Sequence, residues 1–236
     1  MMVGYIALGN YKLISLQRVD STQNHAQQMI LDGRAVDGTV ILADVQTAGR
    51  GRHARRWVSS SGNLYASFIF DAVPRDARLA YVAAVAVADV MASFGIECGI
   101  KWPNDILING AKVCGILIEY VGDFAVLGVG INIMSAPEIS EYATTYMAKY
   151  ISVTRDAVMG QLMRALEKWR MADFSQVRDA WMQRALGLGQ DVIYRGKCAQ
   201  MCGINADGAL VLRQDGKEIL VWGDEIRMNF SKKSGE

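Results

Sequence analysis

Residues 46 to 57 form the part of the chain whose side chains are best suited to binding a charged ligand. The sequence there is QTAGRGRHARRW, with four arginines and two glycines. Arginine offers a planar fork of N–H donors that suits a carboxylate or a phosphate, and glycine lets the backbone approach a ligand closely. The loop therefore predicts binding of an anionic ligand. The alternatives are a solvated basic loop or a contact patch for nucleic acid.

The charge of the whole chain argues against the nucleic-acid alternative. Its 25 lysines and arginines are balanced by 24 aspartates and glutamates, so the formal net charge is +1. A protein that holds nucleic acid through its phosphates needs a surplus of positive charge over a broad surface. We therefore expect the positive charge to act locally, at the loop, and we expect no nucleic-acid partner.

Length and composition predict a globular protein with a large core. The 236 residues are 51% hydrophobic, enough for one large domain or a large domain with a small one. The apolar run from Leu79 to Phe94 carries Asp89 and is shorter than the roughly 20 residues that cross a bilayer. It predicts a buried helix and no membrane partner. The N-terminal residues show no export signal, so we expect a cytoplasmic location.

The four cysteines, at positions 98, 114, 198 and 202, predict buried free thiols and no disulfide framework. The spacing of Cys198 and Cys202 resembles half of a zinc site. The chain has only two histidines and no second cysteine pair nearby, so we expect no zinc.

Hydrophobic periodicity and turn residues predict an alternation of strands and helices. We expect strands at 13–17, 39–45, 64–70, 96–101, 106–108, 112–120 and 124–129, and helices at 23–30, 74–94, 137–150 and 154–171. From Leu186 onward, short strands alternate with Gly-containing turns, which predicts a small antiparallel barrel. Residues 231–236 are expected to fray.

Two short polar segments lie next to these predicted elements. Ser21 and Thr22 precede a helix, where they serve as caps or offer hydroxyls and free N–H groups to a polar ligand. Capping is the simpler interpretation. Asn104 and Asp105 interrupt two predicted strands and are explained by a turn, and Tyr65 is explained by packing.

Lys112 and three glycines are harder to explain by folding alone. Lys112 begins a nearly all-apolar strand, where a lysine either extends to solvent or meets an anion. Gly115 lies inside that strand, and Gly128 and Gly130 end the next. Glycine weakens a strand unless another group approaches its backbone closely. The pattern favours a ligand lying against this part of the sheet.

Five motifs, in this order, closely resemble those of the biotin protein ligases. They are Asp20-Ser21-Thr22, GRGRHARRW at 49–57, KWPND at 101–105, KVCGIL at 112–117 and GVGIN at 128–132. The resemblance covers almost the whole chain. It begins near Leu13 and leaves no room for a helix-turn-helix module, so the sequence resembles the ligase-only form.

The resemblance implies an α+β fold and a two-step reaction. The fold is a mixed or antiparallel sheet with flanking helices, as in class II aminoacyl-tRNA synthetases, with domains at 1–185 and 186–236, the second an SH3-like barrel. Biotin and ATP, escorted by Mg²⁺, form biotinyl-5′-AMP, and a lysine of a biotin carboxyl carrier protein then takes the biotin. The oligomeric state stays open between monomer and homodimer.

The resemblance also assigns roles to individual residues. Those expected to bind biotin are Ser21, Thr22, Gln23, Gln46, Gly49, Arg50, Gly51, Arg52, Tyr65, Lys112, Gly115, Gly128 and Gly130. Those expected to bind ATP or the adenylate are Arg52, Arg55, Trp57, Asn104, Asp105, Lys112 and Asn132. Lys112, Arg50 and Arg52 are the expected catalytic residues, with Lys112 between the biotin carboxylate and the α-phosphate. The magnesium ligands are unknown.

The arginine loop departs from the family pattern at one position. Ala54 stands where the family usually has glycine, and His53 replaces a variable, often basic residue. If position 54 needs a positive φ, alanine costs about 1 kcal/mol or more there. The rival within the same fold is a lipoate or octanoate ligase. The GRGR and KWPND segments favour biotin.

Overall fold

The computed structural model describes residues 4–8, 10–72, 76–223 and 226–228. Its largest element is an eight-stranded sheet in the order β1-β2-β3-β4-β8-β7-β6-β5. In the described strands β2 pairs with β3 in parallel, and the other ladders of this sheet are antiparallel. The strands are β1 Gly4–Leu8, β2 Tyr11–Val19, β3 Thr39–Gln46, β4 Leu64–Asp71, β5 Gly99–Lys101, β6 Asp105–Ile108, β7 Ala111–Val121 and β8 Phe124–Ile131.

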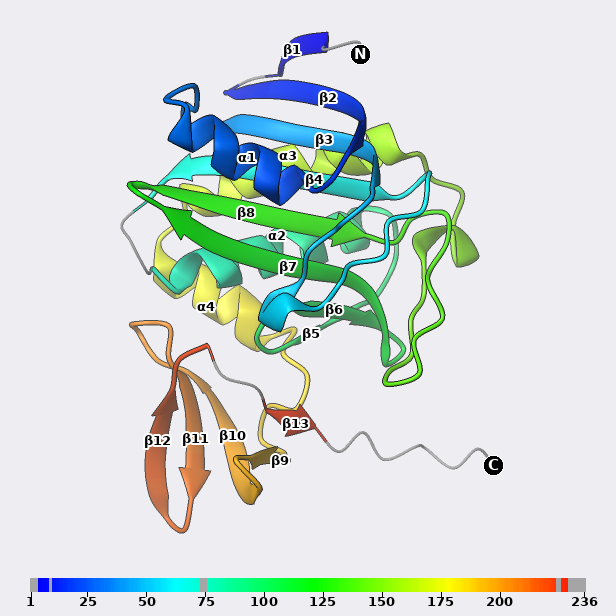
Figure 1. Cartoon of the computed structure of the whole chain (residues 1–236). Coiled ribbons are helices and arrows are strands. Elements are labelled where there is room, and N and C mark those ends of the chain that lie inside the picture. The colour runs from blue at the N-terminus through cyan, green and yellow to red at the C-terminus, as the bar shows by residue number, and fades with distance from the viewer. Residues whose placement is uncertain (1–3, 9, 73–75, 224–225, 229–236) are drawn as a thin grey trace.

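Helices cover both faces of this sheet (Figure 1). Helix α1, Thr22–Leu31, packs on one face over a small cluster that includes Ile14, Ile41 and Ile69. The neighbours of these residues along the strands point to the other face and join the main core beneath α2, Arg78–Ser93, and α3, Arg155–Arg170. Because side chains alternate along a strand, the apolar runs of β2, β3 and β4 supply both clusters.

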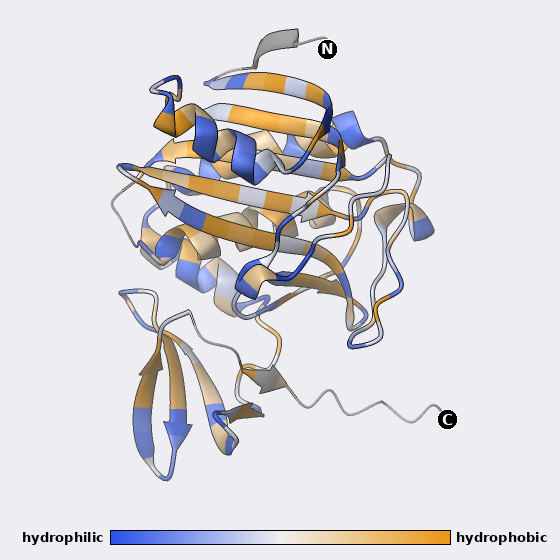
Figure 2. Ribbon diagram, viewed as in Figure 1, coloured by the Kyte–Doolittle hydropathy of each residue, from blue (hydrophilic) through white to orange (hydrophobic). Residues whose placement is uncertain are grey.

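A five-stranded antiparallel sheet follows helix α4, Phe174–Met182, in the order β12-β11-β10-β9-β13. Its strands are β9 Asp191–Tyr194, β10 Lys197–Ile204, β11 Leu210–Gln214, β12 Lys217–Val221 and β13 Arg227–Met228. Figure 2 shows hydrophobic colouring along most of the large sheet and hydrophilic colouring at the tip of the β11–β12 hairpin. The two sheets together confirm the predicted α+β class.

The backbone connects the two sheets across the predicted domain boundary. Ile100 on β5 donates to the carbonyl of Arg184 at 2.8 Å and accepts from the N–H of Leu186 at 2.9 Å. On α2, the Tyr81 hydroxyl donates to the carbonyl of Gly208 at 2.8 Å. The domain boundary between residues 185 and 186 remains a prediction, because Ile100 forms hydrogen bonds with residues on both sides of that boundary.

Most of the predicted helix ends and turns are confirmed. Ser21 Oγ accepts from the N–H of Gln23 at the start of α1, and Thr154 Oγ1 accepts from Ala157 at the start of α3. Gly95 follows the end of α2 with φ 72°. This helix begins at Arg78, not at Pro74. Pro74 and the predicted frayed end at residues 231–236 both lie outside the described residues.

The helix predicted at 137–150 is wrong. The structure has only a 3₁₀ turn there, η2 Met147–Lys149. The backbone instead bonds to the edge of β7: Lys112 N–H donates to Ala143 at 2.8 Å, and Thr145 N–H donates to Lys112 at 2.9 Å. Pairing with a strand satisfies these backbone groups outside a helix, so tertiary contacts override local propensity. This segment therefore lies beside Lys112.

The prediction that all four thiols are buried is also wrong. Cys114 is buried and Cys98 and Cys202 are half-buried, but Cys198 is exposed at the start of β10. Strand β1 and helix α4 had no counterpart in the predictions. No helix among the described residues is long and apolar enough to span a membrane.

Asn63 holds the turn that follows β8 through hydrogen bonds to three backbone residues. Its side chain is 1% exposed, its Oδ1 accepts from the N–H groups of Ile133 and Met134 at 2.8 Å each, and its Nδ2 donates to the Ser135 carbonyl. We expect Asn63→Ala to lower the free energy of unfolding by about 3 kcal/mol, since it leaves buried backbone groups without partners. Urea denaturation measures this.

The matched control is Asn205→Ala, because Asn205 Oδ1 also accepts from two backbone N–H groups, those of Asp207 and Ala209, in a more exposed turn. Its expected loss is about 1 kcal/mol, since water can replace part of those bonds. Equal losses at the two positions would contradict the role given to Asn63.

Candidate active site

A cavity of about 670 Å³ opens where α1, the arginine loop and strands β4, β7 and β8 meet. Every predicted site residue lines it except Gly49 and Asn132. Those that do are Ser21, Thr22, Gln23, Gln46, Arg50, Gly51, Arg52, Arg55, Trp57, Tyr65, Asn104, Asp105, Lys112, Gly115, Gly128 and Gly130. The fold therefore brings together motifs that lie more than 100 residues apart in the sequence.

One end of the cavity is a buried cluster of uncharged polar groups at the start of α1. Gln46 Oε1 accepts from both the N–H of Thr22, at 2.8 Å, and its hydroxyl, at 3.1 Å. Gln23 Nε2 donates to the Val126 carbonyl at 2.9 Å. These side chains are at most 9% exposed, so their hydrogen bonds fix their orientation before any ligand arrives.

Ser67 belongs to this cluster and was missed in the sequence. Its hydroxyl lies 2.9 Å from Thr22 Oγ1 and 3.0 Å from Gln23 Oε1, and the residue is fully buried. The signal was a single serine inside the mostly apolar strand LYASFIF. A buried hydroxyl needs a partner, and this one finds two on α1.

The glycines of β7 and β8 leave space that side chains fill in this structure. Gly115 and Gly130 are paired, and a Cβ on either would lie 2.7 Å from the Trp57 indole. A Cβ on Gly128 would lie 2.7 Å from Gln23 Oε1. These three positions therefore require glycine for close approach, as the sequence indicated, and the indole rests on the surface expected to receive a ligand.

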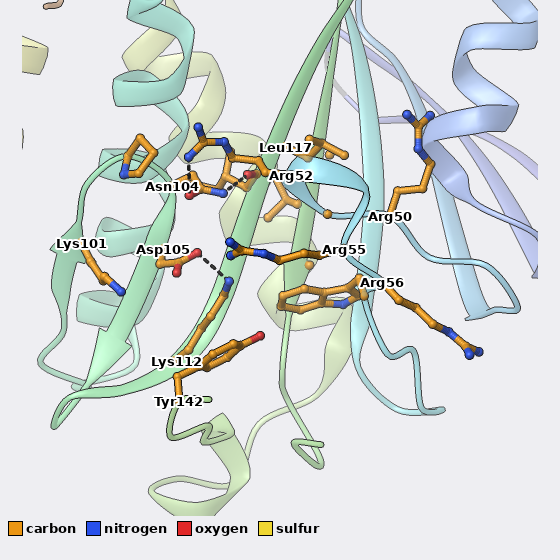
Figure 3. Close-up of a pocket in the computed structure, with 18 of the residues that line it drawn as sticks. Arg50, Arg52, Arg55, Arg56, Lys101, Asn104, Asp105, Lys112, Leu117 and Tyr142 are labelled. Atoms are coloured by element: carbon orange, nitrogen blue, oxygen red, sulfur yellow. Dashed lines mark hydrogen bonds and ion pairs between the residues drawn. The ribbon is translucent and has the colours of Figure 1, made fainter. Parts of the chain in front are cut away.

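Lys112 lies at the charged end of the cavity (Figure 3). Its Nζ is 2.6 Å from Asp105 Oδ1, and the two side chains are 16% and 20% exposed. The same Nζ is 5.4 Å from the centre of the Trp57 ring and 5.5 Å from that of Tyr142. The ammonium group thus has a carboxylate and two aromatic rings around it, which interact favourably with a cation.

Tyr142 is the second residue that sequence reasoning missed. It is 42% exposed and lines the cavity from the segment that was predicted to be a helix. Its position follows from the hydrogen bonds that tie Ala143 and Thr145 to Lys112. Those bonds leave no periodic pattern in the sequence, so no signal pointed to this tyrosine.

The arginine loop is a small hairpin. Trp57 N–H donates to Gly49 at 2.9 Å and Gly51 N–H donates to Arg55 at 2.8 Å, and the chain turns at His53 and Ala54. Both turn residues have positive φ, 53° and 57°, and Arg55 N–H closes the turn on the Arg52 carbonyl at 3.1 Å. The loop therefore has a defined shape that holds its side chains apart.

The arginines of this hairpin point in different directions. Arg52 donates to Asn104 Oδ1 at 3.4 Å and to the carbonyl of Gly223 beyond β12. Arg55 points toward Lys112 and Asp105, whereas Arg50 points away from them toward α1 (Figure 3). Arg56 donates to the Thr47 carbonyl at 3.3 Å. Arg52 and Arg55 are thus the loop cations directed to the charged end.

Gly49 and Asn132 serve the structure around the cavity. A Cβ at position 49 would lie 2.5 Å from the Trp57 carbonyl, so the hairpin stem requires glycine there. Asn132 is 2% exposed and its Nδ2 donates to the Thr145 carbonyl at 3.1 Å. It thereby holds the segment that carries Tyr142.

Cys98 and Cys114 do not line the cavity, and burial favours the neutral form of both thiols. Burial raises the pKa of the Cys114 thiol far above its usual range and that of Cys98 to about 11. A neutral buried thiol is a poor nucleophile. The chemistry of the cavity therefore belongs to its cations and polar groups.

Comparison with known proteins now adds to this geometry. The model of the biotin/lipoate A/B protein ligase family matches residues 15–133. The biotin–[acetyl-CoA-carboxylase] ligase of Paracoccus denitrificans is 34% identical over 229 residues, covering 84% of this chain and 92% of that protein. This chain belongs to the biotin/lipoate A/B protein ligase family, among its biotin protein ligases. The resemblance predicted from the five motifs is confirmed.

Other members of the family agree with this placement. The ligase of the same name from Mycobacterium tuberculosis is 34% identical over 217 residues, covering 82% of this chain and 80% of that protein. A biotin protein ligase from Aquifex aeolicus, solved with biotin and ATP, is similar with TM-score 0.78 and 28% identity over 91% of this chain and 98% of that one.

Ala54, where the family usually has glycine, lies in the left-handed region of backbone conformation with φ 57°. An L-residue in the left-handed region is disfavoured by about 1–2 kcal/mol, and glycine is not. Two such residues follow each other at the tip of the hairpin, which has the form of a two-residue turn that favours Asn-Gly. The ordered loop of this family member is therefore less stable than a glycine would make it.

We expect Ala54→Gly to protect the loop from trypsin by about 2- to 5-fold, because removing the strain outweighs the greater freedom of glycine in the open state. The rate of cleavage after Arg52 and Arg55 measures this. Ala136→Gly is the control, since Ala136 does not have a positive φ. Unchanged cleavage of Ala54→Gly would show that its φ does not limit loop order.

Proposed function

We propose that this chain activates biotin with ATP to biotinyl-5′-AMP and transfers the biotin to a lysine of a carrier protein. The observation that carries the proposal is the polarity of one cavity: uncharged hydrogen-bonding groups are buried at one end, and Lys112 with Arg52 and Arg55 lies at the other. Biotin has the same polarity, with a neutral ureido ring at one end and a carboxylate at the other.

The ureido end needs both donors and acceptors. Thr22, Gln23 and Gln46 offer both and are held in place by one another, by Ser67 and by the Val126 carbonyl. Ser21 keeps its capping bond to Gln23 N–H and adds a hydroxyl to the same wall. A pre-formed polar cluster loses little entropy on binding and rejects ligands that leave it unpaired.

The bicyclic ring of biotin is proposed to lie over Gly115, Gly128 and Gly130, with Tyr65 closing the end of the pocket. The Trp57 indole lies over two of these glycines in this structure, so biotin displaces it. The displaced ring moves toward the nucleotide side, where it offers a face for adenine to stack on.

Lys112 is proposed to act at the reacting atoms. In the first step a biotin carboxylate oxygen attacks the α-phosphorus of ATP, and the bond to the pyrophosphate oxygen breaks. Both reactants are anions, and Nζ can bind both in place of Asp105, which it contacts at 2.6 Å. A fixed ammonium group then stabilises the charge on the transferred phosphoryl group without having to reorganise.

In the second step the carrier lysine, as a free amine, attacks the acyl carbon of the adenylate. The bond from that carbon to the phosphate oxygen breaks, AMP leaves with the electron pair of that bond, and the proton of the amine passes to solvent. The hairpin segment Arg50, Gly51 and Arg52 is proposed to cover the adenylate until the carrier arrives, with Arg52 over the cavity and Arg50 holding the hairpin from its outer side. Arg55, Asn104 and Asp105 belong to the nucleotide side, and Asn132 supports it through Thr145.

Magnesium is proposed to enter with ATP and to shield its triphosphate. In the described residues no three His, Cys, Asp or Glu side chains gather as a metal cage. Asp105 and Glu141 line the cavity, and Mg²⁺ is commonly held by one or two carboxylates with substrate phosphates and water. These donors therefore fit an ion that arrives on the substrate.

The remaining predictions are part of this proposal. The partner is a biotin carboxyl carrier protein, the location is cytoplasmic, and residues 186–236 form a small domain. Arg52 donates to Gly223, and Ile226 and Met228 line the cavity, which supports a role of this domain beside the nucleotide and the incoming carrier.

Lys112→Ala tests the electrostatic role. We expect biotin-dependent exchange between ATP and pyrophosphate to fall by about 10² to 10³, as when one electrostatic stabiliser is removed. The exposed Lys149→Ala is the control and should keep the wild-type rate. Near-normal exchange by a folded Lys112→Ala protein would rule out this role.

The wild-type protein should give no exchange when lipoate or octanoate replaces biotin. Added nucleic acid should bind weakly and only at low salt.

Arg52→Gly tests retention of the adenylate. The variant loses both contacts that join the loop tip to Asn104 and Gly223, so the loop should open over a bound adenylate. We expect free biotinyl-5′-AMP in solution to rise about 10-fold, on the order of one charge-assisted hydrogen bond. Mass spectrometry of the ultrafiltrate measures it. Retention equal to wild type would place the closing contacts elsewhere.

A further inference from the structure

The Arg50 side chain lies on the outer side of the hairpin, away from Lys112 and toward α1 (Figure 3). Its Nη1 donates to Asn24 Oδ1 at 2.8 Å, and its Nη2 donates to Glu119 Oε1 at 2.5 Å. The guanidinium group thus connects the loop to a helix and to a strand of the large sheet.

Both partners are themselves held. The second oxygen of Glu119 accepts from Gln27 Nε2 at 2.9 Å, and Asn24 Nδ2 donates to Asp20 Oδ2 at 2.7 Å. The hydrogen bond from Asn24 is the largest cause that lowers the pKa of Asp20. These five side chains, which we call the loop anchor, run from Asp20 through Asn24, Arg50 and Glu119 to Gln27.

The loop anchor ties the hairpin to the helix that begins with the biotin-side residues. Asn24 lies in the first turn of α1 and Gln27 in the second, and the first residues of this helix, Thr22 and Gln23, line the cavity. Glu119 lies on β7 on the same face as Gly115, two side-chain repeats away. A rigid helix and a central strand therefore determine where Arg50, and with it the stem of the hairpin, can lie.

We infer that Glu119 is a positioning residue for the arginine loop. Its carboxylate fixes Arg50 on the outer side, which leaves Arg52 and Arg55 on the inner side over the cavity. Glu119 lies outside the residues that line the cavity, and its side chain is 26% exposed. This inference rests on the proposed adenylation, because retention of the adenylate is what the loop position is inferred to serve.

The charge of Glu119 matters more than its bulk. An exposed ion pair alone contributes little, but here one carboxylate accepts two hydrogen bonds and one guanidinium donates two, each to a different element. Glu119→Gln keeps the length of the side chain and loses its charge. Glu119→Ala loses both the length and the charge.

The test measures free biotinyl-5′-AMP and tryptic cleavage of the loop for wild type, Glu119→Gln, Glu119→Ala and the control Glu97→Ala, an exposed glutamate after α2. We expect release of adenylate and cleavage to rise about 5-fold in Glu119→Ala and about 2-fold in Glu119→Gln. The control variant should release adenylate and be cleaved at wild-type rates. All variants should keep the wild-type free energy of unfolding. Release at the wild-type rate from Glu119→Ala would overturn the inference.

A double-mutant cycle shows whether Glu119 acts through Arg50. If it does, Arg50→Ala with Glu119→Ala releases adenylate no faster than Arg50→Ala alone, because the contact is already lost. Effects that multiply would overturn this route of action. Failure of the proposed function is distinct, since wild-type protein would then make no adenylate from biotin and ATP at all.

Discussion

The site depends on one electrostatic constraint: the Lys112 side chain is only 16% exposed, so its ammonium group needs negative charge or polarisable groups beside it. A buried charge without a partner costs several kcal/mol, so the fold provides Asp105 and two aromatic rings around it. The same constraint makes the lysine ready for an anionic ligand. Two substrate anions can replace one carboxylate, and the surrounding rings then lie where a flat base can pack.

This constraint explains the backbone around Lys112. The register between β6 and β7 shifts at Ile106 and Leu107, and the segment at 143–145 pairs with Lys112 from the other side. Asn132, just after β8, donates a hydrogen bond to that segment, and Asn63 accepts one from Ile133 in the turn that follows β8. The polar residues between these elements therefore stabilise the position of one side chain as much as they stabilise the fold.

Much of the fold could be predicted from the sequence because local patterns agree with tertiary packing. The apolar runs of β3, β4 and β8, the caps Ser21 and Thr154, and the glycine after α2 each have a local cause. The glycines of β7 and β8 also pointed correctly to close approach, although the group that approaches two of them here is Trp57.

The rest was decided by contacts between distant segments, which leave little trace in one sequence. The role of Tyr142 could not be predicted, because its segment forms backbone hydrogen bonds with Lys112 and not the expected helix. The role of Glu119 could not be predicted, because its partners lie on α1 and on the arginine loop. The direction of Arg50 also depends on those partners. Which arginines of a basic loop face inward is a property of the surrounding surface, and the presence of four arginines within seven residues cannot specify it.

The parallel pairing of β2 with β3 has a consequence for how the site forms. Parallel neighbours need a crossover connection, and here residues 20–38 provide it with α1 as its helix. The helix that presents the polar end of the cavity is thus also the link that sets the register of the two strands. Alignment of these strands therefore places Thr22 and Gln23 at the polar end of the cavity, whereas the arginine loop follows β3 and lies outside this crossover.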